Sequence, residues 1–357
     1  MMALAKRNNQ RRQDTQTDKT RISQDLLAWF RLYGRDLPWR VKGKAHSNPY
    51  MVWITEIMLQ QTTVKTVHDY FYRWMQRFPT IEDLANAHLE DVLLAWQGLG
   101  YYTRAKKIHE CAQILMHTYQ GQIPDERDKL LKLPGIGPYT ASSICAFAFN
   151  KPETVVDGNV IRVLARLFGL THEVTKEEIY TLGQTLTPPS EGADYASAIM
   201  DLGATVCTPI KPLCEQCPFK NYCVANQQNL TDVIPLIKKP IKKIKTGFVY
   251  LIQNKAGDFY IEKREGKGLL SGLYEFPWQE TQDSYPLFNH ECWQKTNTKV
   301  THTFTHFTLT LTIVRLQINN ESIPSLRGEF VPVSGFKNYP FSTLMKKVMK
   351  HLIENKK

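Results

Sequence analysis

Four of the chain's seven cysteines lie in one short segment, at Cys207, Cys214, Cys217 and Cys223. Disulfides need an oxidising compartment, and the N-terminal sequence has no apolar run typical of a secretory signal. We therefore expect an intracellular protein with reduced thiols, and clustered thiols there indicate a metal site. Zinc sites usually pair two short cysteine knuckles, whereas four thiolates in one compact loop suit an iron–sulfur cluster. The spacing favours iron–sulfur, with zinc and inert thiols as the alternatives.

Two acidic residues occupy positions where a carboxylate could do chemistry. Glu56 lies among the apolar residues of MVWITEIMLQQT, and burial there would raise its pKa. A mostly exposed glutamate is the alternative. Asp157 precedes Gly158 and Asn159 at an expected helix start, where it would cap the helix and also present a fixed carboxylate to a cleft.

The segment LPGIGPYTASSI predicts a hairpin between two helices. Gly135 and Gly137 permit a tight turn, and the next helix is expected to begin near Tyr139. Backbone N–H groups at such a helix start form a site for one DNA phosphate without reading base sequence. An ordinary helix–helix turn is the alternative.

The charge balance indicates a polyanionic partner. Lys and Arg number 45 against 34 Asp and Glu, a net charge of +11, which favours nucleic acid over a membrane surface. No uncharged stretch of eighteen apolar residues occurs in the sequence, so no membrane-spanning helix is expected. A chain of 357 residues is expected to form two domains.

Periodicity divides the chain into four expected segments. Residues 1–20 are polar and basic and are expected to be disordered. Residues 21–230 show helical spacing with short turns and predict an all-α domain that contains the cysteine loop, 207–223. Residues 231–247 are rich in Lys and Pro and predict a linker, either a solvated tether or a phosphate-tracking segment.

Residues 248–357 predict an α+β domain. A hairpin is expected around Gly257, a half-buried strand over 307–313 where apolar residues alternate with threonines, and a closing helix through Leu344, Val348 and Leu352.

Taken together, these features resemble the endonuclease III superfamily of helix–hairpin–helix proteins, and more closely the MutY-type adenine DNA glycosylases. The resemblance is carried by LPWR (37–40), MVWITEIMLQQT (51–62), GLGYY (98–102), LPGIG (133–137), VDGNVIRVLAR (156–166) and MDLGA (200–204). It implies that the four cysteines hold one 4Fe-4S cluster outside the hydrolytic chemistry. The cluster would organise a loop whose Lys211 and Lys220 meet DNA phosphates.

The resemblance also implies a mechanism. Glu56 would protonate N7 of adenine, and Asp157 would stabilise the oxocarbenium-like sugar that adenine leaves behind. Tyr139 and Asn159 would orient these groups. Bifunctional relatives carry a Schiff-base lysine where this chain has Tyr139, and a phenol cannot form an imine, so no efficient strand scission is expected.

Further residues are implied to contact DNA or the lesion. The target base must leave the duplex, and wedge residues would fill the gap; their alternative role is helix surface and core packing. The implied contacts are Arg40, Leu59, Gln60, Gln61, Tyr101, Gly135 and Gly137.

The C-terminal domain resembles the MutT-like domain of the same family. A Nudix hydrolase needs a G-x5-E-x7-R-E-x2-E-E run to bind metal, and residues 272–288 contain none, so we expect a binding domain. Phe304, Thr305 and His306 match the family's 8-oxoguanine-sensing loop, although Ser usually stands where this chain has Thr305. A simple strand edge is the alternative for these residues.

The resulting prediction is a monofunctional adenine DNA glycosylase. It would act as a monomer in a bacterial cytoplasm on double-stranded DNA that pairs adenine with 8-oxoguanine or guanine. Two other hypotheses stay open: a glycosylase/lyase for oxidised pyrimidines, and a non-catalytic iron–sulfur protein that binds DNA.

Overall fold

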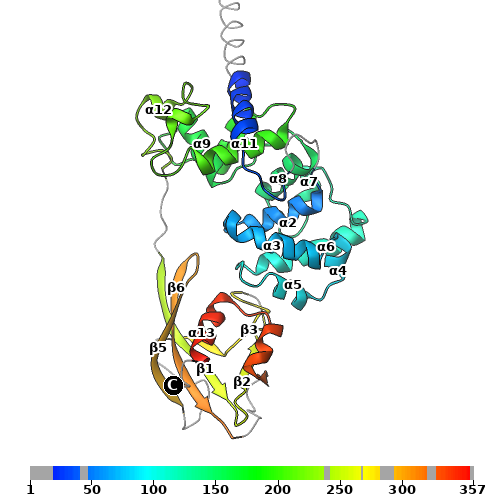
Figure 1. The fold of residues 1–357 in the computed structure, drawn as a ribbon, viewed down its shortest axis with the longest axis vertical. Coiled ribbons are helices and arrows are strands. Elements are labelled where there is room, and N and C mark those ends of the chain that lie inside the picture. Colours follow the sequence, from blue (N-terminus) through cyan, green and yellow to red (C-terminus); the bar gives the residue numbers. More distant parts are fainter. Residues whose placement is uncertain are drawn as a thin grey trace, which may run out of the picture. The chain divides into compact units, whose positions relative to one another are not determined.

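The computed structural model describes residues 19–40, 47–236, 242–266, 268–281, 293–319 and 327–353. It divides the chain into two compact units (Figure 1). The first unit comprises Met1–Ala85 and Glu110–Lys238, and the second comprises Asn86–His109 and Lys239–Lys357. The segment Asn86–His109 thus groups with the C-terminal part of the chain, whereas the sequence suggested one helical domain over 21–230; those expected boundaries stay a prediction.

The first unit is helical. A helix over residues 19–33 begins before the expected start at residue 21, while the rest of the expected disordered segment lies outside the described residues. The helices that follow are α2 (Pro49–Leu59), α3 (Val64–Arg77), α4 (Ile81–Asn86), α6 (Thr103–Tyr119), α7 (Arg127–Leu130), α8 (Pro138–Phe149), α9 (Gly158–Phe168), α10 (Lys176–Gln184), α11 (Gly192–Thr205), the 3-10 turn η1 (Cys214–Gln216) and α12 (Val224–Gln227). Helices α4 and α6 each continue into the second unit.

Local signals explain where these helices begin. The Asn48 side chain accepts from the Tyr50 and Met51 amides at the start of α2, and Pro49 is its first residue. Thr80 and Asp83 exchange side-chain and backbone hydrogen bonds before α4, which makes a capping box.

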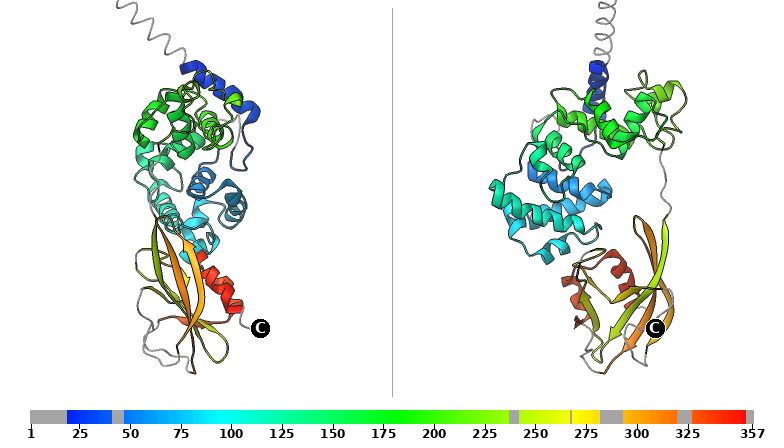
Figure 2. Two further views of the ribbon diagram at one scale, coloured as in Figure 1. Left: turned by 90° about the vertical axis from the view of Figure 1, so that its left-hand side faces the viewer. Right: turned by 180° about the vertical axis from the view of Figure 1, so that it is seen from behind.

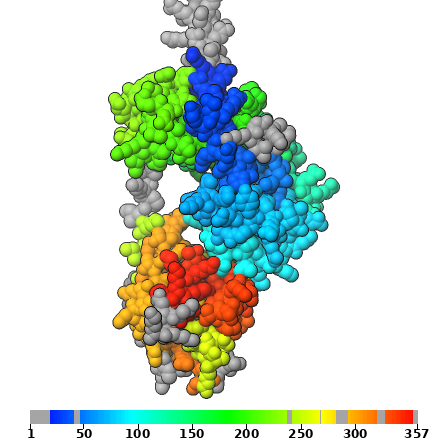
Figure 3. Space-filling view, viewed as in Figure 1, coloured from blue at the N-terminus to red at the C-terminus, as the bar shows by residue number. Residues whose placement is uncertain are grey.

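Two helices of the first unit contribute strongly to its buried interior. Helix α2 is apolar on nearly every face, and eight of its eleven residues are buried, as expected for a helix surrounded by others. The 19–33 helix packs Leu26, Leu27 and Phe30 against α9 and α11 in one core cluster. Figure 3 shows this helix in dark blue lying against the green part of the chain. Helices α9 and α11, which line the site described below, thus share one apolar core with the 19–33 helix.

The second unit is built on a mixed sheet. Its strands are β1 (Lys243–Gln253), β2 (Phe259–Lys263), β3 (Tyr274–Glu275), β4 (Trp278–Glu280), β5 (Gln294–Thr303), β6 (Phe307–Gln317) and β7 (Glu329–Val331). The central order is β3-β2-β1-β6-β5, with β4 paired to β1 and β7 to β2. Strand β1 runs parallel to β6 and antiparallel to β2. The unit also contains α5 (Leu89–Ala95) and the 3-10 turn η2 (Val333–Asn338).

Several predictions for this unit are confirmed. Gly257 adopts φ 89° in the turn between β1 and β2, and β6 alternates buried and half-buried residues over 307–313. Helix α13 (Thr343–Ile353) follows the last strand and buries Leu344 and Val348 against the sheet. Figure 2 shows this helix in red beside the strands.

The predicted linker is partly wrong. Residues 243–247, expected in the linker, belong to β1, because their backbone pairs with β6 from Lys243 onward. Residues 237–241 lie outside the described residues. Within the described part of the chain, no helix has the length and apolar character to cross a bilayer.

Candidate active site in the helical unit

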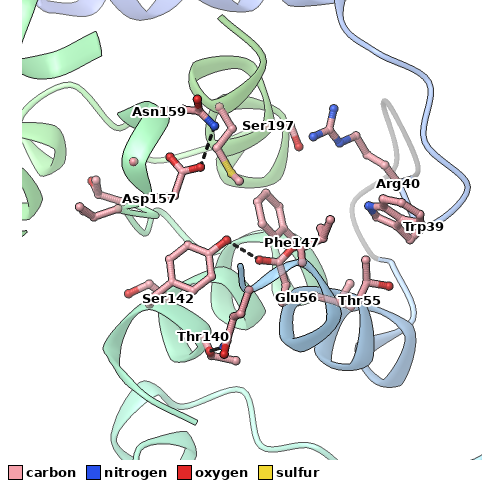
Figure 4. Close-up of a pocket in the computed structure, with 18 of the residues that line it drawn as sticks. Trp39, Arg40, Thr55, Glu56, Thr140, Ser142, Phe147, Asp157, Asn159 and Ser197 are labelled. Atoms are coloured by element: carbon pink, nitrogen blue, oxygen red, sulfur yellow. Dashed lines mark hydrogen bonds between the residues drawn. The ribbon is translucent and has the colours of Figure 1, made fainter. Parts of the chain in front are cut away.

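A pocket of about 1290 Å³ opens in the first unit. Residues from α2, α8, α9 and α11 line it, together with the loop around Arg40. The structure brings ten of the predicted site residues to this one pocket: Arg40, Glu56, Leu59, Gln60, Gln61, Gly135, Gly137, Tyr139, Asp157 and Asn159. Figure 4 shows the side chains of Glu56 and Asp157 approaching this pocket from different helices.

Glu56 is a buried acid with one strong partner. Its side chain lies on α2 with 5% of the residue exposed, so the alternative of an exposed glutamate is wrong. The Tyr139 hydroxyl, at the start of α8, donates to Glu56 Oε2 at 2.8 Å. Burial raises the pKa of Glu56 to about 7, while the Tyr139 bond and the nearby Arg40 charge oppose that rise. The carboxyl group is therefore poised to hold or release a proton near neutral pH.

Asp157 caps α9 as predicted. Its Oδ1 accepts from the Val160 amide at 2.7 Å, and its Oδ2 accepts from Asn159 Nδ2 at 2.9 Å. Burial raises the pKa of Asp157 above its ordinary value, and these two hydrogen bonds work against that rise. The cap fixes the carboxylate toward the pocket, and Asn159 orients it directly.

Arg40 is held in place by a buried acid that sequence reasoning missed. Asp201 on α11 is fully buried; it accepts from Arg40 Nη1 at 2.9 Å and from Arg35 Nε at 2.9 Å. Although burial raises it, Arg40 and Arg35 together hold the pKa of Asp201 below its ordinary value. The MDLGA motif thus supplies the anchor of an arginine at the pocket. The direct DNA contact expected of Arg40 stays a prediction.

The end of α2 carries the predicted wedge residues. Gln60 Nε2 donates to Thr140 Oγ1 at 3.1 Å, which ties this helix end to α8. Gln61 adopts a left-handed backbone with φ 60°, an uncommon conformation for a residue with a side chain. Both residues and Leu59 line the pocket; their insertion into DNA stays a prediction.

Sequence reasoning also missed Arg162 and Thr55. Arg162 Nη2 donates to Asn159 Oδ1 at 2.8 Å, and its Nε donates to the Cys207 carbonyl at 2.7 Å, so it links the α9 start to the cysteine loop. Its place three residues after Asn159 was the available signal. Thr55 lines the pocket fully buried, and its hydroxyl has no hydrogen-bond partner among the described residues.

The four cysteines surround a second, smaller pocket. Their thiols are free of disulfides, and all four line this pocket with Arg166. Among the described residues, no three His, Cys, Asp or Glu side chains meet as ligands of one metal ion. Four thiols around one pocket suit a cluster that is held at its corners by four thiolates.

Arg166 supports that fit electrostatically. Its guanidinium is buried and donates to Cys207 Sγ at 3.4 Å and to the Thr208 carbonyl at 2.7 Å. Its Nε donates to the Ile234 carbonyl at 2.9 Å. A buried cation beside the sulfurs favours an anionic thiolate-bound group at this position.

The remaining predicted residues belong to the second unit. Phe304, Thr305 and His306 form the turn between β5 and β6, where the Phe304 amide donates to the Phe307 carbonyl at 2.8 Å. Thr305 and His306 are exposed. The hydroxyl of Tyr101, in the same unit, is hydrogen-bonded to the hydroxyl of Thr305.

Comparison with known families matches three parts of the chain. Residues 54–189 match the HhH-GPD superfamily of base excision DNA repair proteins. Residues 207–223 match the iron–sulfur binding domain of endonuclease III, and residues 248–351 match the NUDIX domain. These matches confirm the expected helix–hairpin–helix domain, the 4Fe-4S loop and the MutT-like domain.

Individual relatives agree with these families. An adenine DNA glycosylase of Buchnera aphidicola subsp. Baizongia pistaciae is 36% identical over 84% of this chain and 87% of its own length. The adenine DNA glycosylase of Rattus norvegicus is 44% identical over 59% of this chain, and the match spans 43% of the rat protein. The structure of a thermostable thymine-DNA glycosylase covers 59% of this chain and 99% of its own, with a TM-score of 0.53 and 29% identity.

Proposed function

The chain belongs to the family of adenine DNA glycosylases, and we propose that it hydrolyses the N-glycosidic bond of adenine paired with 8-oxoguanine or guanine in duplex DNA. The observation that carries this proposal is the pairing of Glu56 with Tyr139 in the pocket that Asp157 also lines. One acid there has a pKa near neutrality, and the other is hydrogen-bonded at a helix start.

Glu56 is the general acid in this proposal. Adenine leaves poorly as an anion, and a proton on N7 makes it a neutral leaving group. A carboxyl group with a pKa of about 7 is substantially protonated at neutral pH and can deliver that proton. After adenine leaves, the resulting carboxylate can take a proton from the attacking water.

Asp157 stabilises the positive charge that develops on the sugar. Its two oxygens are held by the Val160 amide and by Asn159, donors that favour the charged carboxylate. A fixed negative charge beside the sugar stabilises an oxocarbenium-like transition state more than the neutral substrate.

Tyr139 excludes the imine route. A lysine amine would attack the sugar, but a phenol bonded to Glu56 at 2.8 Å has no amine to offer. The hydrolysis is therefore expected to stop at the abasic site.

The hairpin before α8 supplies a sequence-independent DNA contact. Gly135 adopts φ 78°, and no side chain caps the start of α8 at Gly137. The backbone N–H groups at this twelve-residue helix start remain available for a phosphate. The net charge of +11 adds long-range attraction to DNA.

The cluster takes no part in the hydrolysis. When bound, it cross-links the loop through its four thiolates. Arg162 and Arg166 tie this loop to α9, so the loop and the helix that Asp157 caps form one assembly. Exposed Lys211 and half-buried Lys220 lie on the same loop and are proposed to meet DNA phosphates.

The exposed turn Phe304-Thr305-His306 is proposed to read 8-oxoguanine. The enzyme would act as a monomer, in a bacterial cytoplasm with the chromosomal DNA. The test uses purified, iron-loaded protein with duplexes that carry A·8-oxoguanine, A·G, A·T or C·8-oxoguanine. Alkali-dependent cleavage at adenine in the first two supports the proposal. Absence of base release from both would overturn it, and efficient borohydride trapping would replace it with a lyase.

A further inference from the structure

The loop between α5 and α6 is held in an unusual backbone conformation. Gly98, Gly100 and Tyr101 have φ of 111°, 72° and 47°. Glycine adopts positive φ without strain, but a tyrosine there costs free energy and persists only when its surroundings enforce it. The Tyr101 residue is 44% exposed. The fold thus presents an aromatic ring to solvent on a strained backbone.

Arg104, in the first turn of α6, touches this loop at four places. Its Nη2 donates to the carbonyls of Leu99 and Gly100, each at 3.2 Å. The guanidinium carbon lies 5.2 Å from the ring centre of Trp96 and 5.4 Å from that of Tyr101. The guanidinium therefore packs between a buried indole and an exposed phenol.

The surroundings fix the guanidinium itself. Trp96 is fully buried, and its Nε1 donates to the Gly100 carbonyl at 3.0 Å. Burial lowers the pKa of Arg104 to about 10, which leaves it charged at neutral pH. A planar cation with several donors can bond two carbonyls and stack on two rings at once, and a lysine cannot do so.

An exposed aromatic ring at a loop tip of a DNA-binding protein is suited to enter a base stack. The ring must already point outward, because rotation on arrival would cost binding free energy. The Tyr101 hydroxyl is also bonded to Thr305, so the ring's position bears on the residue proposed to meet the oxidised base.

We propose that Arg104 is a positioning residue for lesion recognition: it holds the Tyr101 ring in the orientation that enters the DNA. It acts through Tyr101 and not by contact with a phosphate. This inference rests on the proposed function, because it assigns Tyr101 to the same DNA site.

The test is a double-mutant cycle in the full-length, iron-loaded protein. Arg104→Met and Arg104→Lys are each made alone and together with Tyr101→Leu. Two quantities are measured on an A·8-oxoguanine duplex: the single-turnover excision rate, and the fluorescence of 2-aminopurine placed beside the lesion, which reports unstacking on binding.

We expect Arg104→Met to lower the single-turnover excision rate about ten-fold and to remove most of the fluorescence rise. Arg104→Lys should retain only part of the rate and part of the fluorescence rise. In the Tyr101→Leu background the same substitution should change both by less than about two-fold, since the two residues act as one unit. Arg73→Met is the matched control: Arg73 is an exposed arginine that stacks on Tyr70 at 4.4 Å in α3. It should leave both readouts unchanged.

Equal losses in both backgrounds, in variants with wild-type iron content and thermal midpoint, would overturn the inference. So would a weaker dependence of DNA affinity on salt in Arg104→Met but not in Arg104→Lys, as expected for loss of a charge that contacts a phosphate. If wild-type protein releases no adenine, the proposed function fails, yet the fluorescence cycle still shows whether Arg104 acts through Tyr101. If Arg104→Met does not fold, the Arg104→Lys cycle carries the test.

Discussion

Tyr139 donates its hydroxyl hydrogen to Glu56 Oε2 at 2.8 Å, from the position where the bifunctional relatives that the sequence resembles carry a lysine. One residue thus removes the imine chemistry and at the same time contacts the proposed general acid. Because this hydrogen bond favours the ionised form of Glu56, it keeps the carboxyl pKa lower than burial alone would make it. The proton affinity of Glu56 is thus set by burial against the Tyr139 phenol, with the Arg40 charge acting in the same direction as the phenol.

Tyr139→Phe should therefore shift the pH dependence of excision. The proposed acid works only when protonated, so the wild-type single-turnover rate should fall as pH rises through about 7. Without the phenol the pKa of Glu56 rises further, and the alkaline limb should move to higher pH. A pH–rate profile of both proteins measures this. An alkaline limb at the same pH in both would show that Glu56 is not the titrating group.

Asp157→Asn should retain the fold and lose the chemistry. Asparagine caps helices about as well as aspartate, so α9 should still begin at Gly158. Loss of the negative charge removes a transition-state interaction of roughly 3–4 kcal/mol. If the orientation of the side chain is lost as well, the excision rate should fall by several powers of ten. The check is a single-turnover rate beside thermal unfolding. A near-normal rate would assign cation stabilisation to another group.

Cys217→Ser should separate the cluster from the chemistry. Loss of one of four thiolates should lower iron below about four atoms per chain and weaken DNA affinity or folding. Excision within already bound substrate should change much less. Iron content, DNA titration and single-turnover rates at saturating protein give the three quantities. A variant that binds DNA normally yet fails in the chemical step would contradict this separation.

Thr305→Ala with His306→Ala should reduce lesion preference. Each side chain is expected to contribute about 1–2 kcal/mol, so the rate ratio of A·8-oxoguanine to A·G should fall by more than about ten-fold. The double substitution is preferable to deletion of residues 248–357. Deletion would also remove the Phe341 carbonyl that accepts from Gln97 and Tyr102, and would disturb the segment that carries Tyr101. An unchanged ratio would place recognition of the oxidised base elsewhere.

The elements that local signals specify were predictable. The Asp157 cap and the alternation over 307–313 both depend on residues close in sequence. The start of β1 was missed, because its Lys-rich residues become a strand only through pairing with β6, more than sixty positions later.

The candidate site was likewise predictable only where residues close in sequence specify it. The motifs named Glu56, but not its burial, since α2 is apolar on nearly every side. The roles of Asp201 and Arg162 depend on partners about 40 to 166 positions away. No local pattern could indicate these distant pairings, although the i,i+3 spacing of Asn159 and Arg162 was a local signal for their contact.

Glu56→Gln should make the protein more stable at alkaline pH. The folded-state pKa of about 7 lies above the ordinary 4.5, so the folded protein binds more protons than the unfolded chain between these values. The wild type therefore loses stability as pH rises through that window, by up to about 3 kcal/mol. Glutamine has no carboxyl proton to lose in this pH range, so the variant does not lose this stability. Urea unfolding at pH 5 and pH 8 tests it, with exposed Glu126→Gln as the matched control.

The most direct test of the account is the single-turnover excision rate of Glu56→Gln on an A·8-oxoguanine duplex, measured with the protein in excess. The variant should bind the duplex with wild-type affinity. Adenine release should be slower by several powers of ten, because an amide cannot deliver the proton. A rate within a few-fold of the wild type, in a folded and iron-loaded variant, would contradict the assignment of Glu56 as the acid and with it the proposed mechanism.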